Sequence, residues 1–138
     1  MVSLIIGNKG SGKTKRLIEQ VNQASDASEG NVVCIEKEPK LTYDIRHSVR
    51  LISTDTYGLT GYPALYGFLC GICAGNYDVT DILMDATLKI GGRDFAALAD
   101  FLEKAAALSQ ASDTRFIFTV SCEESELPAG IFKICQKL

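Results

Sequence analysis

Eight consecutive residues near the N-terminus have the types and spacing needed to hold a phosphate group. They match the pattern G-x-x-x-x-G-K-[ST], in which glycines let successive N–H groups converge on phosphate oxygens. The lysine reaches the β- and γ-phosphates, and the final hydroxyl ligates Mg²⁺. By chance a chain of this composition holds about 0.01 such motifs. We call this segment the phosphate loop; it consists of Gly7, Asn8, Lys9, Gly10, Ser11, Gly12, Lys13 and Thr14.

The residues around the loop predict the strand and the helix that such a loop needs. Residues 3–6 are an apolar run of the kind found in buried strands. From Lys13 onward, apolar residues recur at helical spacing through Leu17, Val21 and Ala24. A phosphate group at the loop would therefore face the positive N-terminal end of a helix.

Two aspartates compete as the acidic metal ligand that would accompany Thr14. Asp85 follows the apolar run 82–84, which is typical of a strand covered on both faces. Asp55 follows residues 49–54, whose polar members indicate an edge strand, and it begins the D-x-x-G sequence Asp55–Gly58. The buried-strand argument favours Asp85, with Asp55 as the alternative.

The remaining segments alternate between strand and helix patterns. Apolar runs at 31–36 and 116–120 predict further buried strands, and helical periods begin at Pro63 and Phe95. Residues 127–138 repeat their apolar positions at helical spacing, which predicts a C-terminal helix. We therefore expect one three-layer α/β domain over residues 1–138, with a mostly parallel sheet of about five strands and helices on both faces.

Composition and charge exclude several classes of partner. The net charge of −3 offers no general attraction to nucleic acid or to anionic lipid. No apolar run approaches the roughly 18 residues of a membrane helix, and the first residues lack the features of a signal peptide. We expect a cytoplasmic protein without membrane insertion.

The cysteines predict buried free thiols. Their number, five, is odd, which does not suit a fully paired disulfide framework. Cys70 and Cys73 have C-x-x-C spacing, but the chain has a single histidine, His47, and no second C-x-x-C to complete a zinc site. They also fall inside a predicted helix rather than at its N-terminus, where a redox pair is usually placed.

The phosphate loop between its strand and helix resembles that of the P-loop NTPase superfamily. The resemblance implies that the chain binds ATP and Mg²⁺, with Lys13 on the phosphates and Thr14 and Asp85 at the metal. With Asp85 as the metal acid, the chain is similar to the recombinase-like branch, which has an extra strand between the loop strand and the strand of the metal acid. Residues 116–120 would form that strand here. Ser121 would then contact the γ-phosphate. Because no N-K-x-D guanine motif follows Val120, we favour ATP over GTP.

The same resemblance directs attention to a base for hydrolysis. The position after Asp85, where many members carry a carboxylate, is Ala86. Recombinase-like members place a glutamate just past the second strand, and this region holds Glu36 and Glu38; Glu38 is the candidate base. The alternative is that both are solvated acids beside neighbouring lysines. Arg93 could reach the nucleotide of a neighbouring subunit.

These observations predict a small Mg²⁺-dependent ATPase or ATP-driven switch that acts on a protein partner or on further copies of itself. Loops such as residues 57–68, with three tyrosines, would offer the contact surface. A small-molecule or nucleoside kinase, a non-hydrolysing nucleotide sensor and a divergent GTPase stay open as alternatives. The chain also resembles the nucleotide core of pilus retraction ATPases, but we expect no motor activity from a single domain with one histidine.

Overall fold

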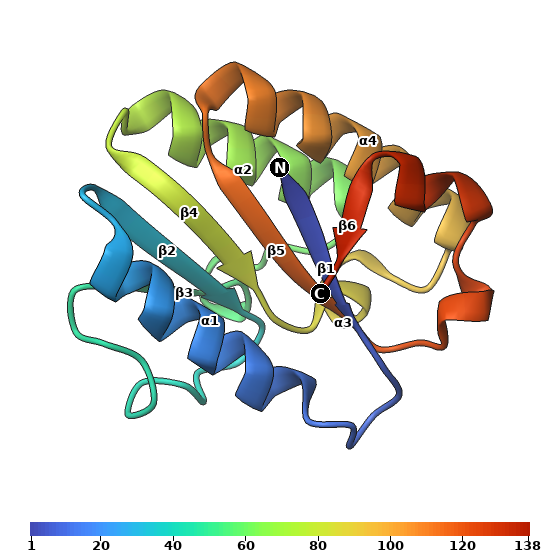
Figure 1. Ribbon diagram of the computed structural model, residues 1–138, viewed down its shortest axis with the longest axis horizontal. Helices are drawn as coiled ribbons and strands as arrows, with labels where there is room; N and C mark the ends of the chain where they lie inside the picture. The colour runs from blue at the N-terminus through green and yellow to red at the C-terminus, as the bar shows by residue number, and fades with distance from the viewer.

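Six parallel strands form one sheet in the computed structural model, which describes all of residues 1–138 (Figure 1). The strands are β1 (Val2–Ile6), β2 (Asn31–Glu36), β3 (Arg50–Ser53), β4 (Val79–Met84), β5 (Arg115–Val120) and β6 (Cys135–Lys137). Their order across the sheet is β3-β2-β4-β5-β1-β6. Every neighbouring pair is parallel, so all carboxyl ends lie along the same edge.

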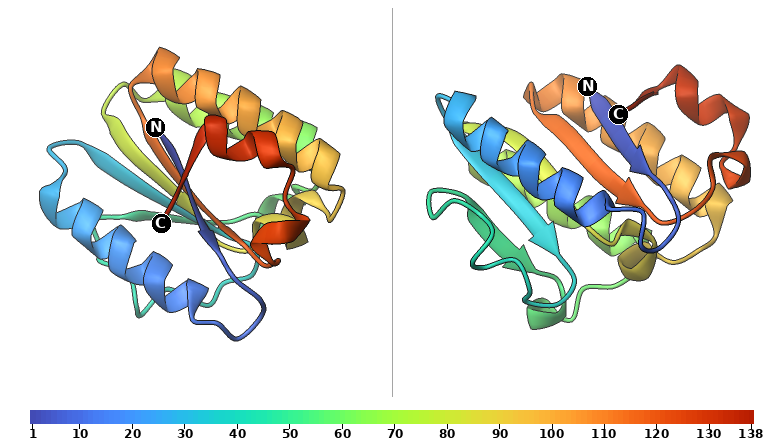
Figure 2. Two further views of the ribbon diagram at one scale, coloured as in Figure 1. Left: turned by 45° about the vertical axis from the view of Figure 1, so that its right-hand side comes forward. Right: turned by 60° about the horizontal axis from the view of Figure 1, so that its bottom comes forward.

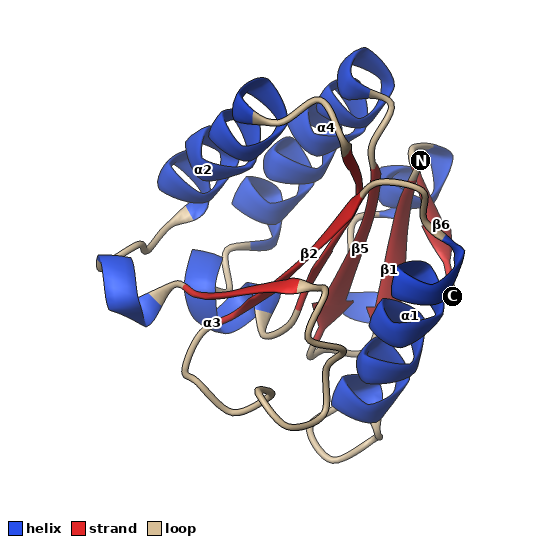
Figure 3. Cartoon of the chain, turned by 90° about the vertical axis from the view of Figure 1, so that its left-hand side faces the viewer, coloured by secondary structure: helices blue, strands red, loops and turns tan.

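Helices cover both faces of the sheet and give the three layers that the sequence predicts. The helices are α1 (Lys13–Ala27), α2 (Tyr62–Gly75), α3 (Thr87–Gly91) and α4 (Phe95–Ser112). Figure 3 shows α2 and α4 on one side of the sheet and α1 on the other. No helix is both long enough and apolar enough to cross a bilayer.

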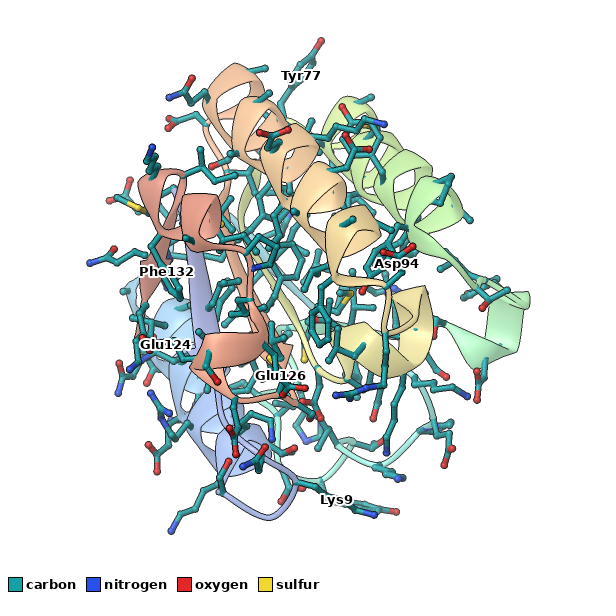
Figure 4. The ribbon with its side chains drawn as sticks, turned by 90° about the vertical axis from the view of Figure 1, so that its right-hand side faces the viewer. Lys9, Tyr77, Asp94, Glu124, Glu126 and Phe132 are labelled. Carbon is teal, nitrogen blue, oxygen red and sulfur yellow. The ribbon has the colours of Figure 1, made fainter.

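The starts of two helices follow the local sequence. Pro63 lies in the first turn of α2, where its missing N–H has no helical partner to lose. Asp94 caps α4, because its Oδ1 accepts hydrogen bonds of 3.0 Å from Ala96 N and 3.1 Å from Ala97 N. Figure 4 labels Asp94 at this helix start.

Alternate residues of each central strand enter different cores, which explains why these strands are apolar throughout. Leu4 and Ile82 belong to a cluster of 24 buried residues beneath α2 and α4. Their chain neighbours Ile5 and Leu83 belong to a cluster of 11 beneath α1. The sheet is thus buried on both faces, as expected of parallel strands.

The predicted order of the central strands is confirmed. Strand β5 lies between β4 and β1, so residues 116–120 do separate the loop strand from the strand that Asp85 follows. The predicted edge strand, residues 49–54, contains β3, which pairs only with β2.

The predicted C-terminal helix is wrong. Residues Ala129–Lys133 form a short 3-10 helix, and β6 then pairs in parallel with β1 (Figures 1 and 2). Leu138 N also donates to Leu4 O at 2.9 Å. The apolar spacing does mark buried side chains, among them Ile131 and Cys135. The segment forms a strand because the backbone groups on this side of β1 would otherwise have no hydrogen-bond partners.

Helix α3 was not predicted, because five residues are too few to show a helical period.

Candidate functional site

The phosphate loop joins β1 to α1 and leaves the start of that helix open to a ligand. Gly10 and Gly12 have φ values of 84° and 85°, a region that residues with a Cβ rarely adopt. Gly12 precedes the first turn of α1, and no side chain caps the free N–H groups there. At Gly7, an added Cβ would overlap the Ser11 side chain. The loop therefore depends on its glycines and presents unpaired backbone donors to an anion.

Lys13 is held inside the loop rather than extended into solvent. Only 7% of the residue is exposed, and its Nζ donates a 3.0 Å hydrogen bond to the carbonyl oxygen of Asn8. Burial lowers the pKa of Lys13 from its usual 10.5, while nearby Asp85 and Cys122 act in the opposite direction. A phosphate group would supply the negative charge that this partly desolvated ammonium lacks.

Asp85 meets the phosphate loop at the carboxyl ends of β4 and β5. Its Oδ2 accepts a hydrogen bond of 3.1 Å from Thr14 Oγ1. Its Oδ1 accepts one of 2.6 Å from Thr119 Oγ1, which in turn accepts from Ala86 N at 3.0 Å. Sequence reasoning missed Thr119; its only signal was a hydroxyl within an otherwise apolar run. The structure thus unites Thr14 and Asp85, as the sequence predicts.

Asp55, the competing metal acid, lies outside this arrangement. Lys37 Nζ bonds both of its carboxylate oxygens at 3.1 Å. Asp55 lines neither of the two cavities that meet at Asp85. The geometry therefore favours Asp85 over Asp55.

A cavity of about 600 Å³ extends from the phosphate loop across the ends of β4 and β5. It is strongly cationic, although the whole chain carries a net charge of −3. Figure 4 shows Lys9 and Glu126 at this end of the molecule and Tyr77 at the opposite end. The charged residues of the lining are five cations and one carboxylate: Lys9, Lys13, Lys15, Lys89, Arg93 and Asp85.

A second cavity of about 160 Å³ adjoins the first and contains the candidate bases. Both cavities are lined by Thr14, Asp85, Ala86 and Lys89. The second also has Glu36 and Glu38 in its wall, so the structure brings these glutamates to the same edge as the loop.

The two glutamates have different surroundings. Glu36 is 4% exposed, and its Oε1 accepts hydrogen bonds from Lys40 N at 2.8 Å and Leu41 N at 3.1 Å. Glu38 is exposed, and its Oε2 lies 3.6 Å from Lys40 Nζ. Glu36 therefore holds the loop after β2 in place, whereas the Glu38 carboxylate is exposed and has only this long ion pair with Lys40.

Ala86 adopts a strained backbone conformation between the two cavities. Its φ of 58° and ψ of 39° are left-handed, and it stands directly before α3. In this conformation Ala86 N donates a hydrogen bond to Thr119 Oγ1. Because residue 86 is alanine, no carboxylate directly follows Asp85. Local strain of this kind is concentrated at functional sites.

The other residues singled out from the sequence differ in whether they line the large cavity, are exposed or are buried. Ser121 lines the large cavity, and Arg93 lines the same cavity of its own chain. Tyr57 is 63% exposed, whereas Tyr62 is buried and donates to Gly92 O at 2.7 Å. Burial raises the pKa of Tyr62 to about 12. Only part of the segment 57–68 is therefore available as a contact surface.

The five cysteines are free thiols, and four are buried. Cys70 and Cys73 both lie within α2, as predicted. Cys73 Sγ is 3.9 Å from Thr114 Oγ1.

Comparison with protein-family models gives no match to this chain, and a search of curated proteins gives none either. The motif and the geometry around it are therefore the basis for a function.

Proposed function

We propose that this chain binds Mg²⁺-ATP in the large cavity and works as a small ATPase or ATP-driven switch of the P-loop type. The observation that carries the proposal is the hydrogen bond between Thr14 and Asp85, which joins the start of α1 to the end of β4. These two side chains are distant in sequence. In P-loop proteins a nucleotide-bound Mg²⁺ is held by a hydroxyl oxygen and a carboxylate beside the phosphates, and Thr14 and Asp85 supply these two groups.

The donor atoms suit Mg²⁺ held jointly with phosphate. Mg²⁺ prefers oxygen ligands and commonly uses one or two carboxylates together with phosphates and water. Thr14 and Asp85 would hold it here, and Thr119 would keep the carboxylate oriented. Phosphate oxygens and water would complete the shell. The ion would supply positive charge to the transferred phosphoryl group.

Charge complementarity supports a polyphosphate as the ligand. The cavity sets five cations against one carboxylate, whereas the protein surface as a whole is acidic. ATP is the preferred nucleotide because the end of β5 lacks the guanine-reading sequence. A protein partner or a second copy would detect the bound state through loops at this edge, including the exposed Tyr57.

Thermal unfolding with and without Mg²⁺-ATP tests the proposal. At a ligand concentration of 100 times Kd, binding stabilises the folded chain by about 2.7 kcal/mol. Lys13→Ala should abolish this stabilisation, because it removes the buried ammonium of the phosphate loop. Lys104→Ala is the matched control, since Lys104 is exposed on α4 and paired with Asp100 at 3.2 Å. Equal stabilisation of the Lys13 variant and wild type would contradict the proposal.

A phosphotransferase is the second candidate, and the second cavity favours it. Its volume of about 160 Å³ exceeds the roughly 10–15 Å³ of such space that one water needs, so a small acceptor has room next to Asp85. Glu36 or Glu38 would then accept the proton of an acceptor hydroxyl. Phosphate release from Mg²⁺-ATP alone indicates hydrolysis, whereas release or transfer that requires an added acceptor indicates a kinase.

A further inference from the structure

Arg93 is a cation of the large cavity that does not belong to the phosphate loop. It follows α3 and reaches across the end of β5, where its Nη1 donates to Ser121 O at 3.1 Å. Its Nη2 lies 4.0 Å from Glu126 Oε1, and its guanidinium carbon lies 5.7 Å from the ring centroid of Phe95. Only one of the five guanidinium N–H donors makes a hydrogen bond within 3.5 Å. The others are available to a ligand.

The backbone that carries Arg93 is held firmly. Gly91 packs so closely against the Tyr62 ring that no Cβ would fit, and Gly92 O accepts the Tyr62 hydroxyl at 2.7 Å. Ile90 O accepts from Gly61 N at 2.9 Å. The end of α3 is therefore fixed to the start of α2, which limits the positions that Arg93 can adopt.

Glu126 is held independently of Arg93 and faces its guanidinium. Its Oε2 accepts from Glu123 N at 2.8 Å within a capping box, which leaves Oε1 facing Arg93. Figure 4 labels Glu126, which ends the short 3-10 helix Glu124–Glu126 that follows β5. The ion pair is long and partly exposed, so its loss to a phosphate would cost little.

Arg93 and Lys13 approach the cavity from different elements but share a neighbour. Cys122, which follows Ser121, is 1% exposed. Burial and Glu126 raise the pKa of its thiol, whereas both Arg93 and Lys13 act to lower it. Both cations line the same cavity, together with Ser121 at the end of β5.

We propose that Arg93 binds the terminal phosphate of the nucleoside triphosphate held by its own chain and so distinguishes a triphosphate from a diphosphate. This inference rests on the proposed function. The phosphate loop and the start of α1 hold the inner phosphates, and the γ-phosphate points away from that helix toward the ends of β4 and β5. Arg93 exchanges its contact with Glu126 for a charge-assisted bond to that group. A diphosphate leaves Arg93 with Glu126.

Calorimetric titration with the Mg²⁺ complexes of AMPPNP and ADP measures this selectivity. Arg93→Ala should weaken AMPPNP binding by about tenfold or more and ADP binding by less than about twofold. Arg93→Lys should recover part of the loss, because it restores the charge without the planar fork. Arg46→Ala is the matched control: Arg46 is similarly exposed and paired with Asp26 at 3.3 Å, but it lies outside the cavity.

The outcomes separate this inference from the proposed function. Failure of the wild type to bind either nucleotide overturns both. Wild-type binding of both nucleotides, with equal losses or no loss in Arg93→Ala, overturns only the role of Arg93. Far-UV circular dichroism and the unfolding temperature without ligand confirm that the variants fold.

Mixing two variants tests whether Arg93 serves its own chain. Lys13→Ala keeps Arg93 but cannot bind nucleotide, and Arg93→Ala keeps the phosphate loop. An equimolar mixture should bind AMPPNP with the weakened affinity of Arg93→Ala alone. Recovery of wild-type affinity would show that Arg93 acts on a neighbouring chain, and it would overturn the inference.

Discussion

The Thr14 hydroxyl and the Asp85 carboxylate are hydrogen bonded at 3.1 Å, although they are 71 positions apart in the chain. Thr14 lies in the first turn of α1, and Asp85 directly follows β4. The second Asp85 oxygen is held by Thr119 at 2.6 Å. The side chains proposed to hold Mg²⁺ are thus already adjacent and oriented, which reduces the free-energy cost of arranging them when the nucleotide binds.

Asp85→Asn should remove most of the Mg²⁺ dependence of ATP binding. The amide keeps an oxygen for Thr119 but loses the negative charge, so we expect the ratio of affinities with and without Mg²⁺ to fall by about tenfold. Asp55→Asn is the control; it breaks only a partly exposed pair with Lys37 and should leave the ratio unchanged. Titrations in Mg²⁺ and in EDTA measure the ratio, and the reverse pattern would assign the metal to Asp55.

Glu38→Gln should slow phosphate release by about 100-fold or more while leaving ATP affinity nearly unchanged, because a general base acts after binding. Glu36→Gln keeps an Oε1 that can accept from Lys40 N and Leu41 N, so the loop should stay folded. Single-turnover assays on both variants locate the base. Loss of turnover in Glu36→Gln but not in Glu38→Gln would move that role to the buried glutamate.

Ala86→Gly should stabilise the ligand-free protein by about 1 kcal/mol, because glycine adopts the left-handed conformation at φ 58° without a Cβ clash. Ala107→Gly, in the exposed middle of α4, should instead destabilise by about 1 kcal/mol. Urea denaturation compares the two. A lower midpoint for Ala86→Gly than for wild type would show that this turn carries no strain.

One thiol of the five should react rapidly with Ellman's reagent at pH 8. Cys70 is the one that is not buried. Burial raises the pKa of Cys34 to about 12 and that of Cys135 to about 11, so their reactive thiolates are scarce at this pH. All five should react in guanidinium chloride. Cys70→Ser should abolish the fast phase, and a fast phase that persists in that variant would contradict this distribution of burial.

Local sequence patterns predicted most of the fold. Apolar runs such as residues 31–36 correspond to buried strands, because a strand covered on both faces needs apolar residues at every position. The helical periods predicted to begin at Pro63 and Phe95 correspond to α2 and α4, whose starts depend on effects confined to one helical turn. The helix predicted for residues 127–138 was wrong because a few apolar residues at helical spacing also suit a 3-10 helix followed by a strand. Pairing with β1 decided that segment.

The sequence by itself determined the phosphate loop, since its glycines, Lys13 and Thr14 act through neighbouring backbone. It also singled out Asp85 through the apolar run before it. Only the tertiary structure brought Thr119 onto Asp85 and Arg93 into the cavity of its own chain. The reason is physical: these contacts join separate elements at one edge of the sheet. Their positions depend on the order and register of the strands, which no local pattern encodes.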